Sequence, residues 1–111
     1  MIITLDPTHA DFTILELDSK VLKFPHNAHD AGAAIIRALG KLNLSEQDEL
    51  QVVAGPGNFT AVRSAALIAN SIAYSSGCKL SSKQKSARDF SHVECVIPFY
   101  ATPPSITIAK S

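Results

Sequence analysis

Apolar and polar residues alternate in the first quarter of the chain, a pattern typical of short β-strands. Residues 1–5 are apolar and β-branched, and Asp6-Pro7-Thr8 then turns the chain, because proline fixes φ and aspartate bonds its own following backbone. Apolar residues resume over 12–17, and residues 21–24 alternate until Pro25. The sequence therefore predicts an antiparallel meander of three short strands.

Two later segments have the three- and four-residue spacing of amphipathic helices. The first spans residues 28–42, and Asn27 is placed to cap its N-terminus. The second spans residues 59–76. Its expected N-cap is Asn58, and Gly77 supplies the left-handed residue that ends it. The apolar stripe of the second helix is wide and made mainly of alanine, which lets backbones approach closely. We therefore expect this helix to pack on a sheet and against the other helix.

The order of these elements predicts an α/β fold. Residues 50–53, between the two helices, are expected to form a fourth strand that is parallel to the first and buried on both faces. Residues 78–80 add a fifth strand to a mixed sheet. A meander followed by helix, strand and helix is the opening of an RNase H-like or actin-like ATPase (ASKHA) domain.

The pattern weakens after Gly77. Residues 81–92 are polar and aperiodic, which predicts a loop or a poor helix. Strand composition over 93–100, a stiff turn at Pro103-Pro104 and apolar residues at 106–109 predict a terminal hairpin. We expect this hairpin to complete the sheet or to cover its edge, because an exposed edge invites aggregation.

Composition is that of one globular domain. The chain has 111 residues, of which 46% are hydrophobic and 18% charged, and this excludes a disordered protein. Ten basic residues balance ten acidic ones, which argues against a broad electrostatic grip on nucleic acid. The local basic segment is expected to be a solvated loop rather than a phosphate contact. Its basic residues are Lys79, Lys83, Lys85 and Arg88.

Cysteine usage and hydropathy indicate a cytoplasmic protein. Cys78 and Cys95 lack the spacing of metal ligands, so a reduced pair is expected. The first residues lack the basic and apolar regions of a signal peptide. No segment approaches the roughly 20 apolar residues that a membrane-spanning helix needs.

Two turns are candidate anion sites. Gly55-Pro56-Gly57 precedes a helix and, with Asn58, would present free N–H groups at the positive end of the helix dipole. It lacks the G-K-[ST] of a P-loop and any nearby lysine, so a tight strand-to-helix turn is the favoured interpretation. Asp6 lies where actin-like ATPases organise phosphate and metal, but a turn-forming role is favoured there too.

Other candidate chemistry is weaker. His26 and His29, spaced as HNAH, would share a helix face, yet no third metal ligand is evident and exposed or capping histidines are favoured. No serine lies in a G-x-S-x-G nucleophile elbow. The sequence therefore predicts no catalytic residues and no metal site, which argues against an enzyme.

Residues 55–63, GPGNFTAVR, resemble the GPGSFTGLR signature of the TsaB (YeaZ) family, accessory subunits of the bacterial machinery that makes threonylcarbamoyladenosine (t6A37) in tRNA. The likeness is close over residues 52–77. Residues 5–24 resemble the family's opening, in which a strand ends in D-T-S-T, and residues 25–45 resemble its first helix. The departures are Pro7 and His9 in place of hydroxyl residues, Asn58 in place of serine, and Ala61 and Ala65 in place of glycines.

The resemblance implies a scaffold in a shortened form. Family members have two similar subdomains, so residues 1–111 are expected to be a single TsaB-like N-terminal subdomain, with 93–109 as the start of a truncated second one. Such proteins are inactive relatives that pair with a TsaD-like enzyme through two helices from each partner, and a TsaE-like ATPase joins the pair. ATP and metal are then expected on the TsaD-like partner rather than on this chain, and tRNA would be contacted only indirectly.

Two alternatives remain open. One is a stand-alone nucleotide- or metal-binding enzyme of the actin-like ATPase, or former glycoprotease, family. The other is a self-associating α/β protein of unrelated purpose. Binding of ATP or Zn²⁺ by the purified chain without a partner would favour the first.

A second face of the helix at 59–76 suggests where a partner binds. Opposite the alanine stripe, Leu67 and Tyr74 lie one above the other at seven-residue spacing among polar residues. Apolar residues flanked by polar ones are typical of an interface. We expect this face, extended by the first helix, to bind a TsaD-like subunit, or a second copy as a homodimer when none is present. The expected partner-binding residues are Leu67, Tyr74, Arg63, Asn70, Ile36 and Ala33.

Overall fold

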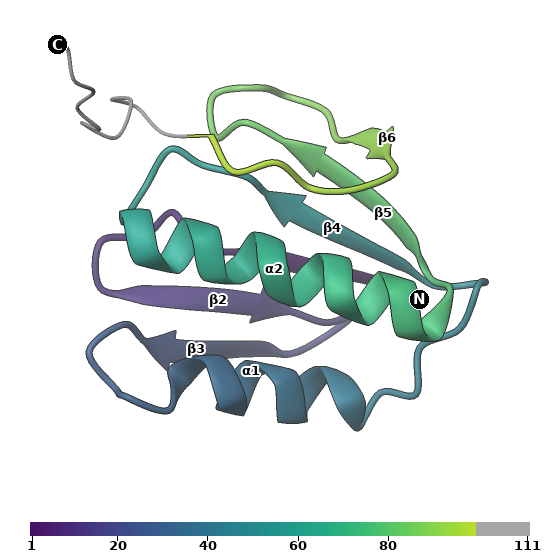
Figure 1. Ribbon diagram of the computed structural model, residues 1–111, viewed down its shortest axis with the longest axis horizontal. Helices are drawn as coiled ribbons and strands as arrows, with labels where there is room; N and C mark the ends of the chain where they lie inside the picture. The colour runs from purple at the N-terminus through teal and green to yellow at the C-terminus, as the bar shows by residue number, and fades with distance from the viewer. Residues whose placement is uncertain (100–111) are drawn as a thin grey trace, which may run out of the picture.

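The computed structural model describes residues 1–99, which form a six-stranded mixed sheet and two helices (Figure 1). The strand order across the sheet is β3-β2-β1-β4-β5-β6. The predicted α/β class is confirmed, with one strand more than expected before the hairpin. The elements in chain order are β1 (Ile2–Asp6), β2 (Phe12–Glu16), β3 (Val21–Pro25), α1 (Ala31–Gly40), β4 (Glu49–Val53), α2 (Phe59–Ser76), β5 (Lys79–Lys83) and β6 (Ser91–Val93).

The register of the sheet puts its apolar residues on one face. In the antiparallel pair of β1 and β2, Leu5 lies opposite Leu15, and in the parallel pair of β1 and β4 the same Leu5 lies opposite Val52. Leu50 of β4 lies opposite Leu80 of β5, also in parallel. All five side chains are buried. The meander and the parallel fourth strand are therefore as the sequence predicted.

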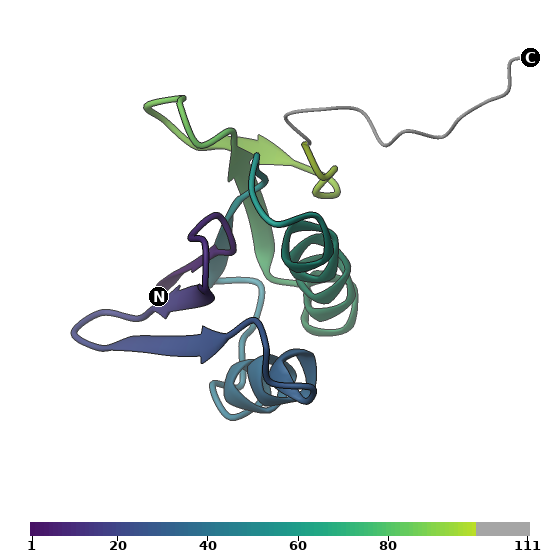
Figure 2. The same ribbon diagram turned by 90° about the vertical axis from the view of Figure 1, so that its left-hand side faces the viewer.

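Both helices cover that apolar face, as the edge-on view in Figure 2 shows. Ile35 and Leu39 of α1 are buried against the sheet, and α2 buries Ala65, Ala66 and Ala69 in the same core. The alanines let α2 lie close to the sheet, because protein interiors are packed to crystal-like density and small side chains shorten the distance between layers. The prediction that α2 packs on a sheet and beside a second helix is confirmed.

The opposite face of the sheet is polar at its centre. Thr4 Oγ1 donates to Gln51 Oε1 (3.2 Å), and the Ser81 hydroxyl donates to the Glu49 carboxylate. Glu49 and Gln51 belong to β4, so the prediction that this strand is buried on both faces is wrong. In the described residues, helices lie on one face only, and the other keeps the polar residues that contact with water requires.

The ends of α2 are those that the sequence predicted. Asn58 is the N-cap, and its Oδ1 accepts from the backbone N–H of Ala61 at 2.9 Å. Gly77 is the C-cap in the left-handed conformation, with φ of 79°, and its N–H donates to the Ala73 carbonyl. Phe59, which the pattern placed on the apolar stripe, keeps 46% of its surface exposed.

The start of α1 differs from the prediction. The helix begins at Ala31 rather than residue 28, and its N-cap is Asp30, which makes no side-chain cap hydrogen bond. Residues 26–30 instead form a turn, in which the Ala28 N–H donates to the Pro25 carbonyl. Asn27 therefore does not cap the helix. The amphipathic spacing continued through this turn and concealed the true boundary.

The segment after α2 also differs. β5 runs through Lys83 because its backbone pairs in parallel with β4, and β6 pairs antiparallel with β5. Residues 81–92 are thus partly strand rather than a loop or helix. The strand predicted over 93–100 includes residue 100, which lies outside the described residues. Within 93–99, only Val93 belongs to a strand, because 94–99 leave the sheet. The remainder of the predicted hairpin lies outside the described residues.

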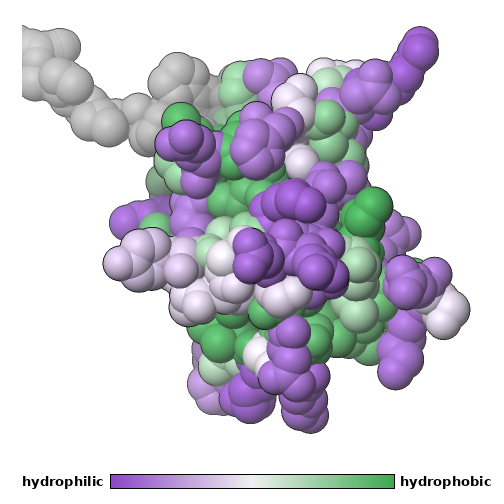
Figure 3. Space-filling model, turned by 90° about the vertical axis from the view of Figure 1, so that its right-hand side faces the viewer, coloured by the Kyte–Doolittle hydropathy of each residue, from purple (hydrophilic) through white to green (hydrophobic). Residues whose placement is uncertain are grey.

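Figure 3 faces the end of the molecule where α1 and α2 finish, and it shows hydrophobic side chains interspersed among hydrophilic ones. Neither helix in the described part of the chain has the length and apolar character needed to cross a membrane.

Candidate functional site

The Asp6 turn is occupied by its own hydrogen bonds. Asp6 Oδ1 accepts from the Thr8 backbone N–H (3.0 Å) and from Thr8 Oγ1 (2.6 Å). Asp6 Oδ2 lies 3.3 Å from His9 Nε2, and the His9 ring stacks on Phe12 with centroids 5.3 Å apart. These contacts are those of a carboxylate that closes a turn, as the sequence favoured.

The Gly55-Pro56-Gly57 turn lies beside the Asp6 turn. Gly55 has φ of 125°, and a Cβ there would collide with the Phe99 carbonyl oxygen. Gly57 has no such φ, but a Cβ on it would lie 2.9 Å from Thr8 Cα. Both glycines are therefore needed for close packing. The reason at Gly57 is the neighbouring backbone rather than the conformation of the residue itself.

A lysine reaches this turn from a distant part of the sequence. The Lys85 backbone N–H donates to the Gly55 carbonyl (2.7 Å), and Lys85 Nζ lies 3.5 Å from the Thr8 carbonyl oxygen. The absence of a nearby lysine, which the sequence suggested, is wrong in space, because Lys85 lies at the turn. Spacing gave no signal, because the contact depends on β5 lying next to β4.

The balance of charge at this end is mixed. Lys85 and the start of α2 favour an anion, whereas the Asp6 carboxylate opposes one. Asn58 Oδ1 already satisfies one of the free N–H groups of the helix, that of Ala61. Phosphate binding by Gly55, Gly57 and Asn58 stays a prediction.

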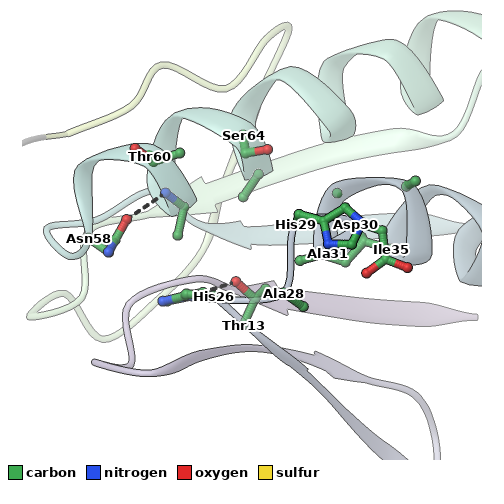
Figure 4. Close-up of a pocket in the computed structure, with 14 residues that line it drawn as sticks. Thr13, His26, Ala28, His29, Asp30, Ala31, Ile35, Asn58, Thr60 and Ser64 are labelled. Carbon is green, nitrogen blue, oxygen red and sulfur yellow. Dashed lines mark hydrogen bonds between the residues drawn. The ribbon is translucent and has the colours of Figure 1, made fainter.

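A pocket of about 600 Å³ lies between the starts of the two helices (Figure 4). His29 and Asp30 line it from the side of α1, and Asn58 and Thr60 line it from α2. His26 Nε2 lies 3.0 Å from Thr13 Oγ1, which holds the ring against β2. The sequence placed His29 on the first helix and His26 before it; in the structure both precede α1.

The described part of the chain does not add further metal ligands to the two histidines. Within residues 1–99, no group of three or more His, Cys, Asp or Glu side chains is placed to hold a metal ion. His29 is exposed, and His26 Nδ1 is buried without a hydrogen-bond partner among the described residues. The pocket is a cleft between helix starts, lined mainly by small residues.

The outer face of α2 has a different character. Leu67 is 59% exposed and Tyr74 is 94% exposed, although both lie on a helix whose opposite side is fully buried. Arg63 is exposed on the same face. The helical pattern predicted these positions correctly, since one side of α2 supplies the core and this side supplies surface.

The first helix continues this surface. Ile36 is 49% exposed, and Ala33 is exposed one turn earlier. The two helices lie close, because a Cβ on Gly32 of α1 would be 3.7 Å from Ser64 Oγ of α2. We call the exposed residues Ala33, Ile36, Arg63, Leu67 and Tyr74 the outer helical face.

Asn70 is engaged within the chain. Its Nδ2 donates to the Val96 carbonyl (3.0 Å), and its Oδ1 accepts from the Val96 N–H (2.6 Å). Val96 is buried, and the Phe99 N–H donates to the Ala54 carbonyl (2.8 Å). Residues 94–99, which we call the strap, therefore run beside α2 from its second half toward its start. A role for Asn70 in partner binding stays a prediction.

The strap adds surface that sequence reasoning missed. Ile97 is 74% exposed and Phe99 is 39% exposed. Both were expected within a strand of the terminal hairpin. No local pattern would have found them, because their placement follows from the tertiary hydrogen bonds of Asn70 and Ala54.

The structure of YeaZ from Pseudomonas aeruginosa is similar to this chain, with a TM-score of 0.51 and 21% sequence identity, over 75% of this chain and 43% of that one. The fold is that of a YeaZ subdomain. This agrees with the fold that the sequence predicted, and the chain spans less than half the length of YeaZ.

A second solved structure also matches. It is described as an uncharacterized protein with similarity to peptidase YeaZ, from Pseudomonas aeruginosa, and it has a TM-score of 0.49 and 20% identity over 75% of this chain and 42% of that one. No model of a known protein family matches the sequence, and the search of curated proteins found no match. At this level of identity, the likeness to YeaZ establishes the fold.

Proposed function

We propose that this chain is a non-catalytic subunit that pairs with a TsaD-like enzyme in the threonylcarbamoyladenosine modification of tRNA. The observation that carries the proposal is the outer helical face, on a fold shared with YeaZ. Leu67, Tyr74 and Ile36 leave large apolar side chains in water on two adjacent helices. Such residues gain free energy when a partner covers them.

The proposed partner contributes two helices of its own. An interface of standard size buries on the order of 1,600 Å² in total, and a few central residues carry most of the affinity. Leu67 and Tyr74 are the proposed centre, because they are separated by two helical turns on one face. Arg63 would lie at the rim, where a charge affects the rate of association more than affinity.

Catalysis and cofactors belong to the other subunits in this proposal. ATP and metal would be held by the TsaD-like enzyme, with a TsaE-like ATPase joining the pair. The balanced charge of the chain, with ten basic and ten acidic residues, fits a protein that contacts tRNA only through its partner. The hydrogen bonds that already occupy Asp6 fit a chain that binds no nucleotide by itself.

The test is co-expression with the TsaD-like protein of the same organism, followed by size-exclusion chromatography. We expect the two proteins to elute together. The double variant Leu67→Glu/Tyr74→Glu should elute alone, with its circular dichroism and melting temperature close to those of the parent. Val21→Glu is the matched control, because Val21 is 53% exposed on β3, away from the helices, and this variant should still pair.

Two outcomes would contradict the proposal. The parent chain could fail to pair, or the double variant could fold and pair as well as the Val21→Glu control. Should the double variant unfold, the single change Tyr74→Glu decides the matter, because a side chain 94% exposed contributes little to folding. Tight binding of ATP or Zn²⁺ by the chain alone would instead favour a stand-alone enzyme.

A further inference from the structure

We propose that Cys78 and Cys95 are an oxidisable pair that forms a disulfide across the open end of the β5–β6 hairpin. Both thiols are free in this structure. In the antiparallel pair of β5 and β6, Ser82 lies opposite Ser91, Ser81 opposite His92, and Leu80 opposite Val93. Each step back along β5 is matched by a step forward along β6. Two more steps in the same register would set Cys78 opposite Cys95, although Cys78 precedes β5 and residues 94–95 have already left the ladder.

The face of the sheet agrees with this register. Leu80 is buried and Val93 packs against the core, so both point toward the helices. Side chains two residues apart on a strand share a face. Cys78 is buried in the same core, 6% exposed. Cys95 follows the end of β6 and is exposed, so it would face Cys78 only if residues 94–95 continued the strand.

A cavity supplies an independent observation. Cys78 and Cys95 both line one pocket of about 610 Å³, which lies between the second half of α2 and the two last strands. Tyr74 and Asn70 of α2 line it as well. The two cysteines therefore border the same cavity rather than separate surfaces.

The expected spacing suits a disulfide. Residues directly opposite each other on antiparallel strands have Cα atoms about 4.5–5.5 Å apart. Disulfides join Cα atoms that are about 4.4–6.8 Å apart. Residues 94–95 have left the ladder, so the bond requires them to move back into the register of β5 and β6.

The unequal exposure of the two thiols gives the reaction its order. Cys95 is exposed, so its thiolate attacks a sulfur of a small-molecule disulfide such as oxidised glutathione, and one small thiol leaves. The Cys78 thiolate then attacks Cys95 Sγ and displaces the second small thiol. The protein loses two protons and two electrons, and the small-molecule disulfide takes them up to become two thiols.

The bond would fix the strap where it begins. Cys95 directly precedes Val96, the residue that Asn70 holds with two hydrogen bonds. Oxidation would therefore fasten the strap to the sheet as well as to α2. This inference does not depend on the proposed function, because it concerns bonds within one chain.

The experiment is incubation of the purified full chain with oxidised glutathione, followed by intact mass measurement and peptide mapping. We expect a mass loss of two hydrogen atoms and a linked peptide pair containing Cys78 and Cys95. The melting temperature of the oxidised form should exceed that of the reduced form by about 10 °C, because the bond lowers the conformational entropy of the unfolded chain. Reduction with a dithiol should reverse both changes.

Two variants test the register. Cys95→Ser should show no internal bond and no redox dependence of the melting temperature. Cys95→Ser/Ile97→Cys places an exposed thiol two residues farther along the strap, out of register with Cys78, and it should also form no internal bond. A stable glutathione adduct on Cys95 with Cys78 free, a dimer linked through Cys95, no reaction, or equal internal bonding in the Ile97→Cys variant would each overturn the proposal.

Discussion

The Gly55-Pro56-Gly57 turn and the outer helical face lie next to each other along the chain, yet their side chains are used differently. The turn contains the most distinctive sequence motif, and its glycines pack against Thr8 and Phe99. The outer helical face shares only Arg63 with that motif, and Leu67 and Tyr74 project into water. The glycines of the motif are thus residues that the fold itself requires.

The difference teaches how to weigh a motif. A residue that is already packed or hydrogen-bonded within its own chain has an explanation without a ligand. A large apolar side chain left in water on a regular helix has none, and an exposed apolar cluster often marks a binding surface. The comparison predicts that changes at the turn reduce stability, whereas changes on the outer helical face affect association.

The largest expected effect is at Gly57. In Gly57→Val, the new Cβ would lie 2.9 Å from Thr8 Cα and 3.3 Å from Val62 Cγ2, and the backbone atom has no room to move aside. We expect a loss of about 3 kcal/mol in the free energy of unfolding, measured by urea denaturation. This is a large fraction of the stability of a small domain.

Alanine gives the matched comparison for this position. Gly57→Ala introduces the same Cβ and should also destabilise the chain. Gly40→Ala, at the end of α1, should be neutral or stabilising, because its Cβ would meet nothing within 4 Å and alanine favours a helix. If Gly57→Val folded normally and lost only anion binding, the turn would be a site rather than a structural feature.

A smaller effect is expected at Asn70, which lies beside the outer helical face but is engaged with the strap. Asn70→Ala leaves the N–H and carbonyl of the buried Val96 without partners. We expect a loss of about 2 kcal/mol in urea denaturation, together with faster amide exchange at Val96. Ser71→Ala, an exposed neighbour on α2, is the control and should leave both unchanged. Loss of pairing without loss of stability would place Asn70 with the outer helical face instead.

Local chemistry explains what the sequence could and could not predict. The bounds of α2 were predictable because Asn58 and Gly77 act on the backbone within a few residues. The start of α1 was not, because Asp30 makes no side-chain cap and the apolar spacing runs on through the turn before it. The outer helical face was predictable from periodicity alone.

Long-range contacts account for the rest. β5 is polar, and its length follows from pairing with β4 rather than from its own composition. Lys85 reaches Gly55, and Asn70 reaches Val96, only after the sheet has formed. None of these contacts can be predicted from a periodic pattern or from neighbouring residues in the sequence.

The smallest expected effect is at Asp48, a surface carboxylate that is hydrogen-bonded within the chain. It tests whether such hydrogen bonds stabilise the fold as strongly at the surface as the buried contacts of the Gly55-Pro56-Gly57 turn do. Asp48 accepts from the Ser45 backbone N–H (2.8 Å) and pairs with the chain's amino terminus (3.0 Å). These contacts lower the pKa of the Asp48 carboxyl, the Ser45 N–H contributing most. Because the folded-state pKa lies below the unfolded value, the stabilisation is present above the unfolded pKa. It is lost as the pH falls through the folded-state pKa.

Asp48→Asn should therefore lower the melting temperature slightly at pH 6, and its difference from the parent should vanish in strong acid. Thermal denaturation from pH 6 down to about pH 2 measures this difference at each step. Glu46→Gln, at a nearby exposed carboxylate, is the control for removal of a surface charge. The effect should stay small because Asp48 remains in contact with solvent, which screens surface ion pairs. If Asp48→Asn cost as much as Gly57→Val, burial would not be what distinguishes the turn from the surface.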